Sequence, residues 1–523
     1  MNLTKAFHID DTVHLETAKW ILQHPWHPMS GRINWDQNAE PIHTLNQPHL
    51  YFYLLAAWGR VWGFGEVQMH MLQAFFALAC ILLIYLIAKI YVSSRALIVT
   101  SLIALSPAFV VGQNLMVDIP LLSFWLAFYY FLLGPQGMPE SRRCILSGFF
   151  CGCACLVKYS SLPLIAVMFA YFVIRRNYRM LWTVFIPIAL LGLWSLFNYF
   201  DYGSVHILGR SSGQWGLKWL LVQVFSFVVC MGSILPYAFL YYRWIGRKHT
   251  ALNKIVRAFL LGGILLFAVV VAGAFVNLFG ESLATRLLLL LFFLNGACIG
   301  LLLLWVLLRS FRYLPRSGHE VTLLLSLWVA FGAVFTVVFT PFMATRHVLL
   351  FIVPITLLLT RYVEKRSAFS WNVMALLVAA SLSTVLGLSD RDWANFYREK
   401  AALIRADLPA DANVYFTGHW GWQWYAAQQG MKPLEALNPQ LRVGDYLVHP
   451  TGIPQQTLEH VPPGLRLVVV KRYEDAPSVL SFFSTRYKHG SFYASGFTTP
   501  PWTVTWRPIP PVVVYKVMPS GIP

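Results

Sequence analysis

Charged residues are scarce in this 523-residue chain, since Asp, Glu, Lys and Arg make up 12% of it and hydrophobic residues make up 57%. A water-soluble globular protein carries about 25% charged residues. The composition therefore excludes an ordinary soluble protein and predicts one whose solvent is lipid.

Acidic residues are the scarcer sign, with 22 against 40 basic residues and a net charge of +18. Such an excess can indicate nucleic-acid binding. Here, however, the basic residues form short clusters between apolar runs, as in the cytoplasmic loops of membrane proteins. We therefore expect the lipid bilayer as a partner and no nucleic acid.

Several common catalytic signatures are missing, because no H-E-x-x-H, G-x-S-x-G or Walker motif occurs. Their absence argues against a zincin, a serine hydrolase and an ATP-driven pump. The seven cysteines all lie in apolar stretches, so we expect buried thiols and no structural disulfide. Cys151, Cys153 and Cys155 scatter around a helix without a further ligand, so we expect no metal there.

Long apolar runs dominate the first three quarters of the chain. Because about 20 apolar residues cross a bilayer, and anchored shorter runs also can, we predict about twelve spans in a polytopic α-helical membrane domain of residues 1–388. The predicted spans are 68–92, 96–113, 118–134, 144–157, 161–174, 180–199, 217–241, 258–279, 287–308, 321–340, 347–360 and 370–388.

The loops between these spans alternate in charge, which sets the predicted orientation. The basic loops fall on one side, which the positive-inside rule makes cytoplasmic. They contain Arg95, Arg142, Arg143, Arg175, Arg176, Arg179, Arg243, Arg247, Lys248, Lys254, Arg257, Arg309, Arg312, Arg316, Arg361, Lys365 and Arg366. We predict a multi-pass protein of the plasma (inner) membrane with its chemistry on the extracytoplasmic side.

Both ends of the chain are predicted to lie outside. Residues 1–67 form a first extracytoplasmic loop with interfacial helices, although residues 1–9 contain neither a signal peptide nor a span that could carry the loop outward. Either a short N-terminal tail is translocated or the true start lies upstream and adds a first helix, and we favour the second.

Residues 389–523 have shorter apolar runs and predict a small extracytoplasmic α/β domain. Strands are expected at 413–417, 445–448, 465–470 and 512–517, and helices at 393–407 and 420–429. The aromatic residues of the second helix can stack on sugars or fill a core, and core is the commoner fate. They are Trp420, Trp422, Trp424 and Tyr425.

Three acids are candidate catalytic residues. Asp10 and Asp11 precede an amphipathic stretch at 13–22, where helix capping would also account for them. Asp118 lies at a predicted membrane boundary, where a charge is costly unless it is paired or used. We predict that Asp10 and Asp118 converge on one polar site. Whether a divalent metal ion lies between them stays open, because their spacing is not diagnostic.

Basic and imidazole side chains reach the same predicted face. Lys158, Arg346 and His347 follow or open spans there, and His43 and His49 lie in the first loop. Cations at this position can stabilise a departing phosphate, while an acid accepts a proton. Snorkelling or contact with lipid headgroups is the alternative role of a single Lys or Arg near a span end.

The order of these features resembles the GT-C superfamily of membrane glycosyltransferases. The closest groups are the bacterial family 39 (protein mannosyltransferase-like) enzymes and the lipid A aminoarabinose transferase. The resemblance covers roughly residues 7–360. It rests on Asp10 and Asp11, NQPHLYFYLLAAW at 46–58, MVDIPLLSF at 116–124, GCACLVK at 152–158 and RHVLLFIVP at 346–354.

The resemblance implies a GT-C fold and an inverting hexosyl or pentosyl transfer from a polyprenyl-phosphate-linked sugar to a lipid, glycan or protein acceptor. It implies catalytic roles for Asp10, Asp11 and Asp118. The residues it places near the donor phosphate are Arg346, Lys158, His347, His49 and Gln47. Gln47 stands where the aminoarabinose transferase has Lys, and His49 replaces a Pro, so the donor sugar is left open.

Two other classes of function remain as alternatives. A transporter or lipid flippase would also use charge within the membrane, but such proteins tend to show internal repeats and paired discontinuous helices near the bilayer midplane. This sequence shows no internal repeat, keeps its charges at one predicted interface and adds a soluble outer domain. A non-catalytic assembly protein would accord with Gln47, whereas the retained acids favour an enzyme.

Overall fold

The computed structural model describes most of the chain. The described residues are 2–45, 47–134, 137–210, 216–242, 250–311, 319–362, 369–437, 439–458, 461–486, 490, 492–494 and 499–520. Several residues of the predicted loops lie outside them, namely Asn46, residues 211–215, Arg243, Arg247, Lys248, Arg312, Arg316, Lys365 and Arg366.

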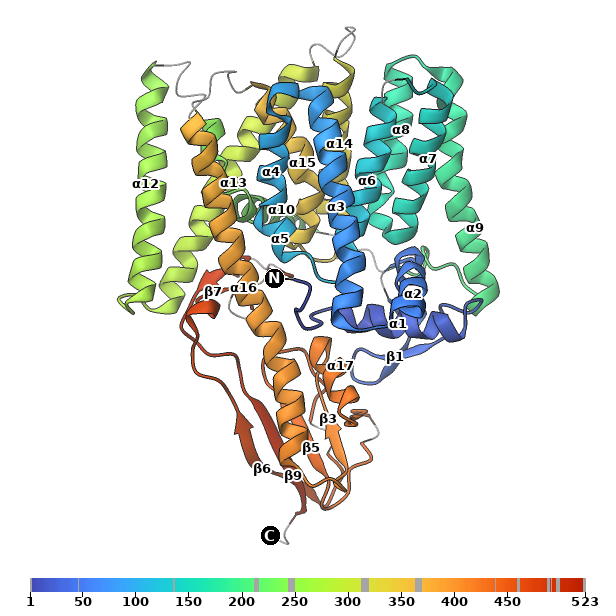
Figure 1. Ribbon diagram of the computed structural model, residues 1–523, viewed down its shortest axis with the longest axis vertical. Coiled ribbons are helices and arrows are strands. Elements are labelled where there is room, and N and C mark those ends of the chain that lie inside the picture. The colour runs from blue at the N-terminus through green and yellow to red at the C-terminus, as the bar shows by residue number, and fades with distance from the viewer. Residues whose placement is uncertain are drawn as a thin grey trace.

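A bundle of helices forms the larger part of the molecule (Figure 1). Its helices are α3 (Glu66–Tyr91), α4 (Ala96–Ala104), α5 (Pro107–Val111), α6 (Asp118–Leu133), α7 (Glu140–Val157), α8 (Pro163–Ile174), α9 (Phe185–Tyr202), α10 (Leu217–Ile234), α12 (Thr250–Phe275), α13 (Glu281–Phe311), α14 (Glu320–Phe339), α15 (Thr345–Tyr362) and α16 (Phe369–Asp407). Among the described residues, 7 helices are long and apolar enough to cross a membrane, and shorter apolar helices accompany them. The predicted multi-pass helical fold is confirmed, while the count of about twelve spans stays a prediction.

Glycines set how closely some of these helices pack. A Cβ at Gly232 of α10 or at Gly296 of α13 would collide with the backbone of the other helix. On α7, a Cβ at Gly148 would meet Ile186 at 3.2 Å, and one at Gly152 would collide with Leu190 of α9. Small residues that allow such close approach are typical of helix contacts in membranes.

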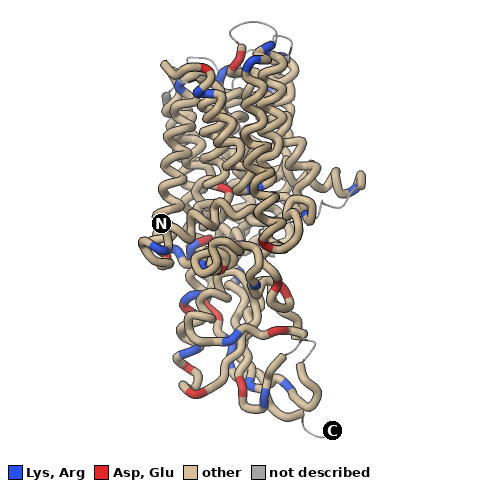
Figure 2. The backbone as a smooth tube through the Cα atoms, turned by 90° about the vertical axis from the view of Figure 1, so that its right-hand side faces the viewer, with Lys and Arg blue, Asp and Glu red and all other residues tan. Residues whose placement is uncertain are grey.

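The bundle has two unlike ends. Figure 2 shows Lys and Arg gathered at its upper end, hereafter the basic end. The helices α1 (Asp11–Gln23) and α2 (Leu50–Trp62) and the strands β1 (Arg32–Asn34) and β2 (Ala39–Pro41) lie against the opposite end, hereafter the sheet end (Figure 1). The helix predicted at 13–22 is thus present as α1.

A five-stranded sheet extends from the sheet end, and its strand order is β4-β3-β5-β9-β6. The strands are β3 (Val414–Phe416), β4 (Lys432–Pro433), β5 (Tyr446–Pro450), β6 (Leu465–Tyr473) and β9 (Val512–Pro519). β3 pairs in parallel with β4 and β5, while β9 is antiparallel to β5 and β6. All four predicted strands and the helix α17 (Trp420–Gln428) are confirmed.

One helix crosses the predicted boundary between the membrane domain and the C-terminal region. α16 runs without interruption for 39 residues, so the prediction of separate helices at 370–388 and 393–407 was wrong. No proline interrupts it, and its second half is rich in alanine and other helix formers, which let the helix continue beyond the apolar run. The division at 388 and 389 stays a prediction.

The remaining sequence predictions concern side chains. All seven cysteines are free, and all but Cys298 are buried. Trp422, Trp424 and Tyr425 are no more than 5% exposed, so these three aromatic side chains fill a core.

Candidate functional site

The ends of three membrane helices meet α1 at the sheet end. Asp10 directly precedes α1, and Asp118 is the first residue of α6. Lys158 directly follows α7, and Arg346 lies in the first turn of α15. Four chain segments that are far apart in sequence therefore deliver two acids and two cations to one place.

Arg346 connects the two acids. Its Nη2 atom lies 3.7 Å from Asp10 Oδ2, and its Nε atom lies 3.8 Å from Asp118 Oδ2. Lys158 donates a hydrogen bond of 2.9 Å to the other oxygen of Asp118. We call these four residues the acid–arginine cluster. The structure thus brings Asp10 and Asp118 together around one guanidinium group.

Capping does not account for these carboxylates. Asp10 is the N-cap residue of α1, but its side chain makes no capping hydrogen bond. The N-cap position of α6 belongs to Val117, with Asp118 one residue inside the helix. The carboxylates instead face cations that come from other elements, as expected for charges at a membrane boundary.

The two acids differ in their surroundings. The Asp118 side chain is 4% exposed and is held by Lys158, whereas Asp10 is 23% exposed and lies beyond normal hydrogen-bond length from Arg346. Asp118 is therefore the more buried and more tightly paired acid, and Asp10 is the more accessible one.

Arg346 has N–H groups that are not fully used as hydrogen-bond donors. Charge-assisted bonds between N–H groups and carboxylates are typically about 2.7–2.9 Å long, and both of its carboxylate contacts are longer. Its Nε group is buried and has no hydrogen-bond partner. A planar guanidinium with free donors suits a phosphate, which it can bind with two bonds at once.

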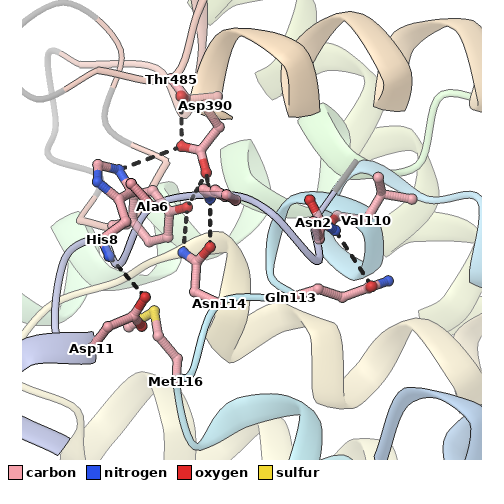
Figure 3. A network of polar contacts seen from close by, with 12 residues as sticks. Asn2, Ala6, His8, Asp11, Val110, Gln113, Asn114, Met116, Asp390 and Thr485 are labelled. Atoms are coloured by element: carbon pink, nitrogen blue, oxygen red, sulfur yellow. Dashed lines mark hydrogen bonds and ion pairs between the residues drawn. The ribbon is translucent and has the colours of Figure 1, made fainter. Parts of the chain in front are cut away.

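Asp11, the third predicted acid, faces another way. It is fully buried, and its Oδ2 atom accepts a 2.8 Å hydrogen bond from the backbone N–H of His8 (Figure 3). Burial raises the pKa of Asp11 to about 8, which favours the neutral carboxyl at neutral pH. This contact holds the turn before α1.

The other residues predicted to contact the phosphate, His347, His49 and Gln47, are buried to different extents. His347 is 7% exposed, and its ring packs against Phe342 at 5.5 Å between ring centroids. His49 is fully buried at the N-cap position of α2, where its ring lies 5.0 Å from that of Phe52. Gln47 is half-buried two residues before it.

His14 lies next to the acid–arginine cluster, and the sequence did not predict it as a site residue. Its ring is 1% exposed and interacts electrostatically with Asp10, Asp118 and Arg346. Its Nδ1 atom bonds the carbonyl of Leu115 at 2.9 Å, and its Nε2 atom has no partner. Burial lowers the pKa of His14. Its spacing could have indicated it, because His14 lies four positions after Asp10 and therefore on the same helix face.

A second polar network, built around Asp390, holds the chain that carries Asp10. Asp390 of α16 forms an ion pair with Lys5 and accepts hydrogen bonds from Thr485 at 3.0 Å and from Tyr493 at 2.7 Å (Figure 3). Lys5 also donates to Asn114, which precedes α6. The network thus joins the N-terminal segment, the start of α6 and the C-terminal region.

The divalent metal ion that the sequence left open has no obvious ligand set in the part of the chain that the structure describes. No group of three or more His, Cys, Asp and Glu side chains that could hold a metal is present among those residues. Arg346 lies against both Asp10 and Asp118. A divalent ion shared by these acids would have to displace the guanidinium group.

The charges of the acid–arginine cluster limit its chemistry. Two carboxylates and two cations sum to zero, so a bound phosphodiester would add one uncompensated negative charge. A leaving phosphate with two negative charges would draw more strongly on Lys158 and Arg346 than the bound diester does. The cluster therefore suits a reaction in which negative charge develops on phosphate while a hydroxyl proton is removed.

Comparison with known proteins finds one matching family model and several solved structures of low similarity. Residues 46–199 match the family model described as dolichyl-phosphate-mannose-protein mannosyltransferase. No curated protein matches the chain.

Three solved structures are similar at low identity. ArnT from Cupriavidus metallidurans bound to undecaprenyl phosphate is 14% identical, with a TM-score of 0.39 over 86% of this chain and 90% of that chain. The oligosaccharyltransferase AglB from Archaeoglobus fulgidus is 12% identical, with a TM-score of 0.44 over 85% and 66%. The arabinofuranosyltransferase AftD from Mycobacteria is 15% identical, with a TM-score of 0.36 over 98% and 40%. Similarities this low assign no role to any residue of this chain.

The family match includes three of the sequence segments that carried the predicted resemblance, those at 46–58, 116–124 and 152–158. It covers less than half of the chain. The predicted resemblance to mannosyltransferase-like membrane enzymes is confirmed for residues 46–199, which match that family model.

Proposed function

We propose that the protein is a glycosyltransferase that moves a sugar from a polyprenyl-phosphate carrier to a hydroxyl acceptor on a lipid, glycan or protein. The observation that carries this proposal is the acid–arginine cluster, in which Arg346 lies 3.7 Å from Asp10 and 3.8 Å from Asp118. The family match over residues 46–199 supports the same reaction class.

In this reaction the acceptor oxygen attacks the anomeric carbon of the donor sugar. A new carbon–oxygen bond forms there, the bond to the phosphate oxygen breaks, and the polyprenyl phosphate leaves with the bonding electrons. Asp10 accepts the acceptor's proton as general base. Attack opposite the leaving phosphate inverts the anomeric carbon.

The cations act on the phosphate. Arg346 and Lys158 offer N–H donors where negative charge grows, and Asp118 fixes Lys158 through its 2.9 Å hydrogen bond. His14 and His347 adjoin the cluster and complete its buried polar surface. All these groups gather at one end of the bundle, which suits interfacial chemistry better than transport across the midplane.

The orientation follows from the basic loops. The basic end is placed in the cytoplasm of a plasma (inner) membrane protein, and the sheet end with its cluster faces outward. A lipid-linked donor would then meet the site from within the membrane, and an acceptor would meet it from the water side.

Mass analysis of lipid and protein glycans in cells with and without the gene tests this proposal. A glycan that disappears with the gene, together with accumulation of a polyprenyl-phosphate sugar, is expected. Identical glycans and identical lipid-linked sugars in the two strains would contradict it.

A further inference from the structure

Three buried polar side chains at the sheet end have hydrogen-bonding atoms without partners. His49 and Asn198 are both fully buried, and neither ring nitrogen of His49 and neither amide atom of Asn198 has a hydrogen-bond partner. The Oγ atom of Ser160 is buried and unpaired as well. Buried polar groups are normally satisfied, so a local group of unpaired ones needs an explanation.

Helix packing brings Asn198 and Ser160 to the same end of the bundle. Gly148 of α7 faces Ile186 of α9, and Gly152 faces Leu190, with the same sequence offset in both pairs. The two helices therefore run in the same direction, so Asn198 near the end of α9 and Ser160 just after the end of α7 both lie at the sheet end.

Trp194 connects this pair to His49. It precedes Asn198 by four residues on α9, so the two share a helix face. The Trp194 ring lies 5.9 Å from that of His49, and the indole also lies beside the Tyr159 hydroxyl. His206 closes the group, because its ring bonds Tyr159 at 3.0 Å and the carbonyl of Leu45 at 2.8 Å.

The group adjoins the acid–arginine cluster. Ser160 follows Lys158 by two residues, and Lys158 holds Asp118. On the other side, the Phe52 ring lies 5.0 Å from both His49 and His14. One aromatic ring therefore separates the unpaired imidazole from the histidine that faces the two acids.

The unpaired groups are uncharged and combine donors with acceptors. Burial holds the pKa of His49 well below its usual value, so its ring is neutral and offers one donor and one acceptor. The amide of Asn198 and the hydroxyl of Ser160 offer both as well. A phosphate, which carries acceptors only, would leave half of these groups unused, whereas sugar hydroxyls match them.

We propose that His49, Ser160 and Asn198 form the subsite that binds the hydroxyl groups of the donor's sugar, next to a phosphate held by Lys158 and Arg346. This inference rests on the proposed function. It makes these three residues determinants of sugar specificity, a role that the sequence did not assign to Ser160 or Asn198.

Lipid binding to the purified full chain in nanodiscs tests the subsite. The probes are undecaprenyl phosphate and its hexosyl and pentosyl derivatives. The wild type should bind one of the two glycosylated lipids about tenfold more tightly than the other, as one well-placed hydrogen bond allows. Both are phosphodiesters of equal charge, so the cations do not produce this preference.

Asn198→Leu should abolish that preference and leave the affinity for bare undecaprenyl phosphate unchanged. Ser160→Ala, which removes one hydroxyl from the short 3-10 helix Tyr159–Ser161, should reduce it. Asn177→Leu is the matched control, because it makes the same change at the basic end, where Asn177 bonds Glu140. Arg346→Ala should weaken the binding of bare and glycosylated lipids alike.

An unchanged preference in both Asn198→Leu and Ser160→Ala would overturn the subsite, with the unpaired groups then serving buried water. Equal loss for bare and glycosylated lipids in these variants would also overturn it, because that pattern means a structural role. Failure of the wild type to bind any of these lipids would instead contradict the proposed function, and the subsite with it.

Discussion

Replacing Arg346 should weaken donor binding, because its guanidinium group is the proposed contact to the donor phosphate. Its two carboxylate contacts, at 3.7 and 3.8 Å, correspond to about 4 kcal/mol each at an effective dielectric constant of about 20. Donor phosphate competes for the same guanidinium. Two charge-assisted hydrogen bonds to phosphate contribute about 3 kcal/mol at the low end, so Arg346→Ala should raise the dissociation constant by about 150-fold.

A graded series separates charge from geometry. Arg346→Lys keeps the charge but loses the fork of parallel donors, so its loss should be about tenfold. Arg361→Ala is the matched control, because Arg361 lies at the other end of α15 and donates to the carbonyl of Tyr91. Binding of undecaprenyl phosphate to purified protein provides the assay. Wild-type affinity in Arg346→Ala would show that this arginine only snorkels.

Three further predictions concern the fold and its orientation. Lys5→Met should leave the buried Asp390 without its cation and lower the unfolding free energy by about 3–5 kcal/mol, and adding Asp390→Asn should restore part of it in thermal unfolding. Because the folded pKa of Asp11 is about 8 and its ordinary value is 3.8, the folded state binds the extra proton, so stability should fall between about pH 4 and pH 8 by up to about 1.4 kcal/mol per pH unit. Asp11→Asn should flatten that slope, and an equal slope would contradict the assignment. A reporter fused after Pro523 should be active only outside the cytoplasm, and cytoplasmic activity would reverse the orientation.

Local patterns predicted most of the fold. Apolar runs located the membrane helices, and alternating short runs located the strands of the C-terminal sheet. The predicted break between two helices before residue 393 was wrong, because the helix continues where the apolar run ends. Asp390 lies where the apolar run ends, but its carboxylate is paired with Lys5 and Tyr493 inside the protein. The helix therefore continues through it.

The site was predictable only in part, because its residues are separated by long stretches of chain. Asp118, Lys158 and Arg346 were identified because each charge stands at the end of a predicted span. Asp10 was identified because it precedes an amphipathic stretch in the first loop. The partnership of Lys5 and Asp390 depends on tertiary folding over 385 residues, which no local pattern encodes. Asn198 was hidden in an apolar run, where a single amide changes the hydrophobic pattern very little.

The turnover of Asp10→Asn tests the central claim most directly. The donor is the polyprenyl-phosphate sugar that accumulates in cells lacking the gene, and the readout is release of polyprenyl phosphate by purified protein. Loss of a general base typically costs about 100- to 10,000-fold in rate. Asp10→Asn should show a loss of that size with donor binding retained, while Asp36→Asn, the same change at an exposed position, should keep the wild-type rate. A wild-type rate in a folded Asp10→Asn protein would contradict the account.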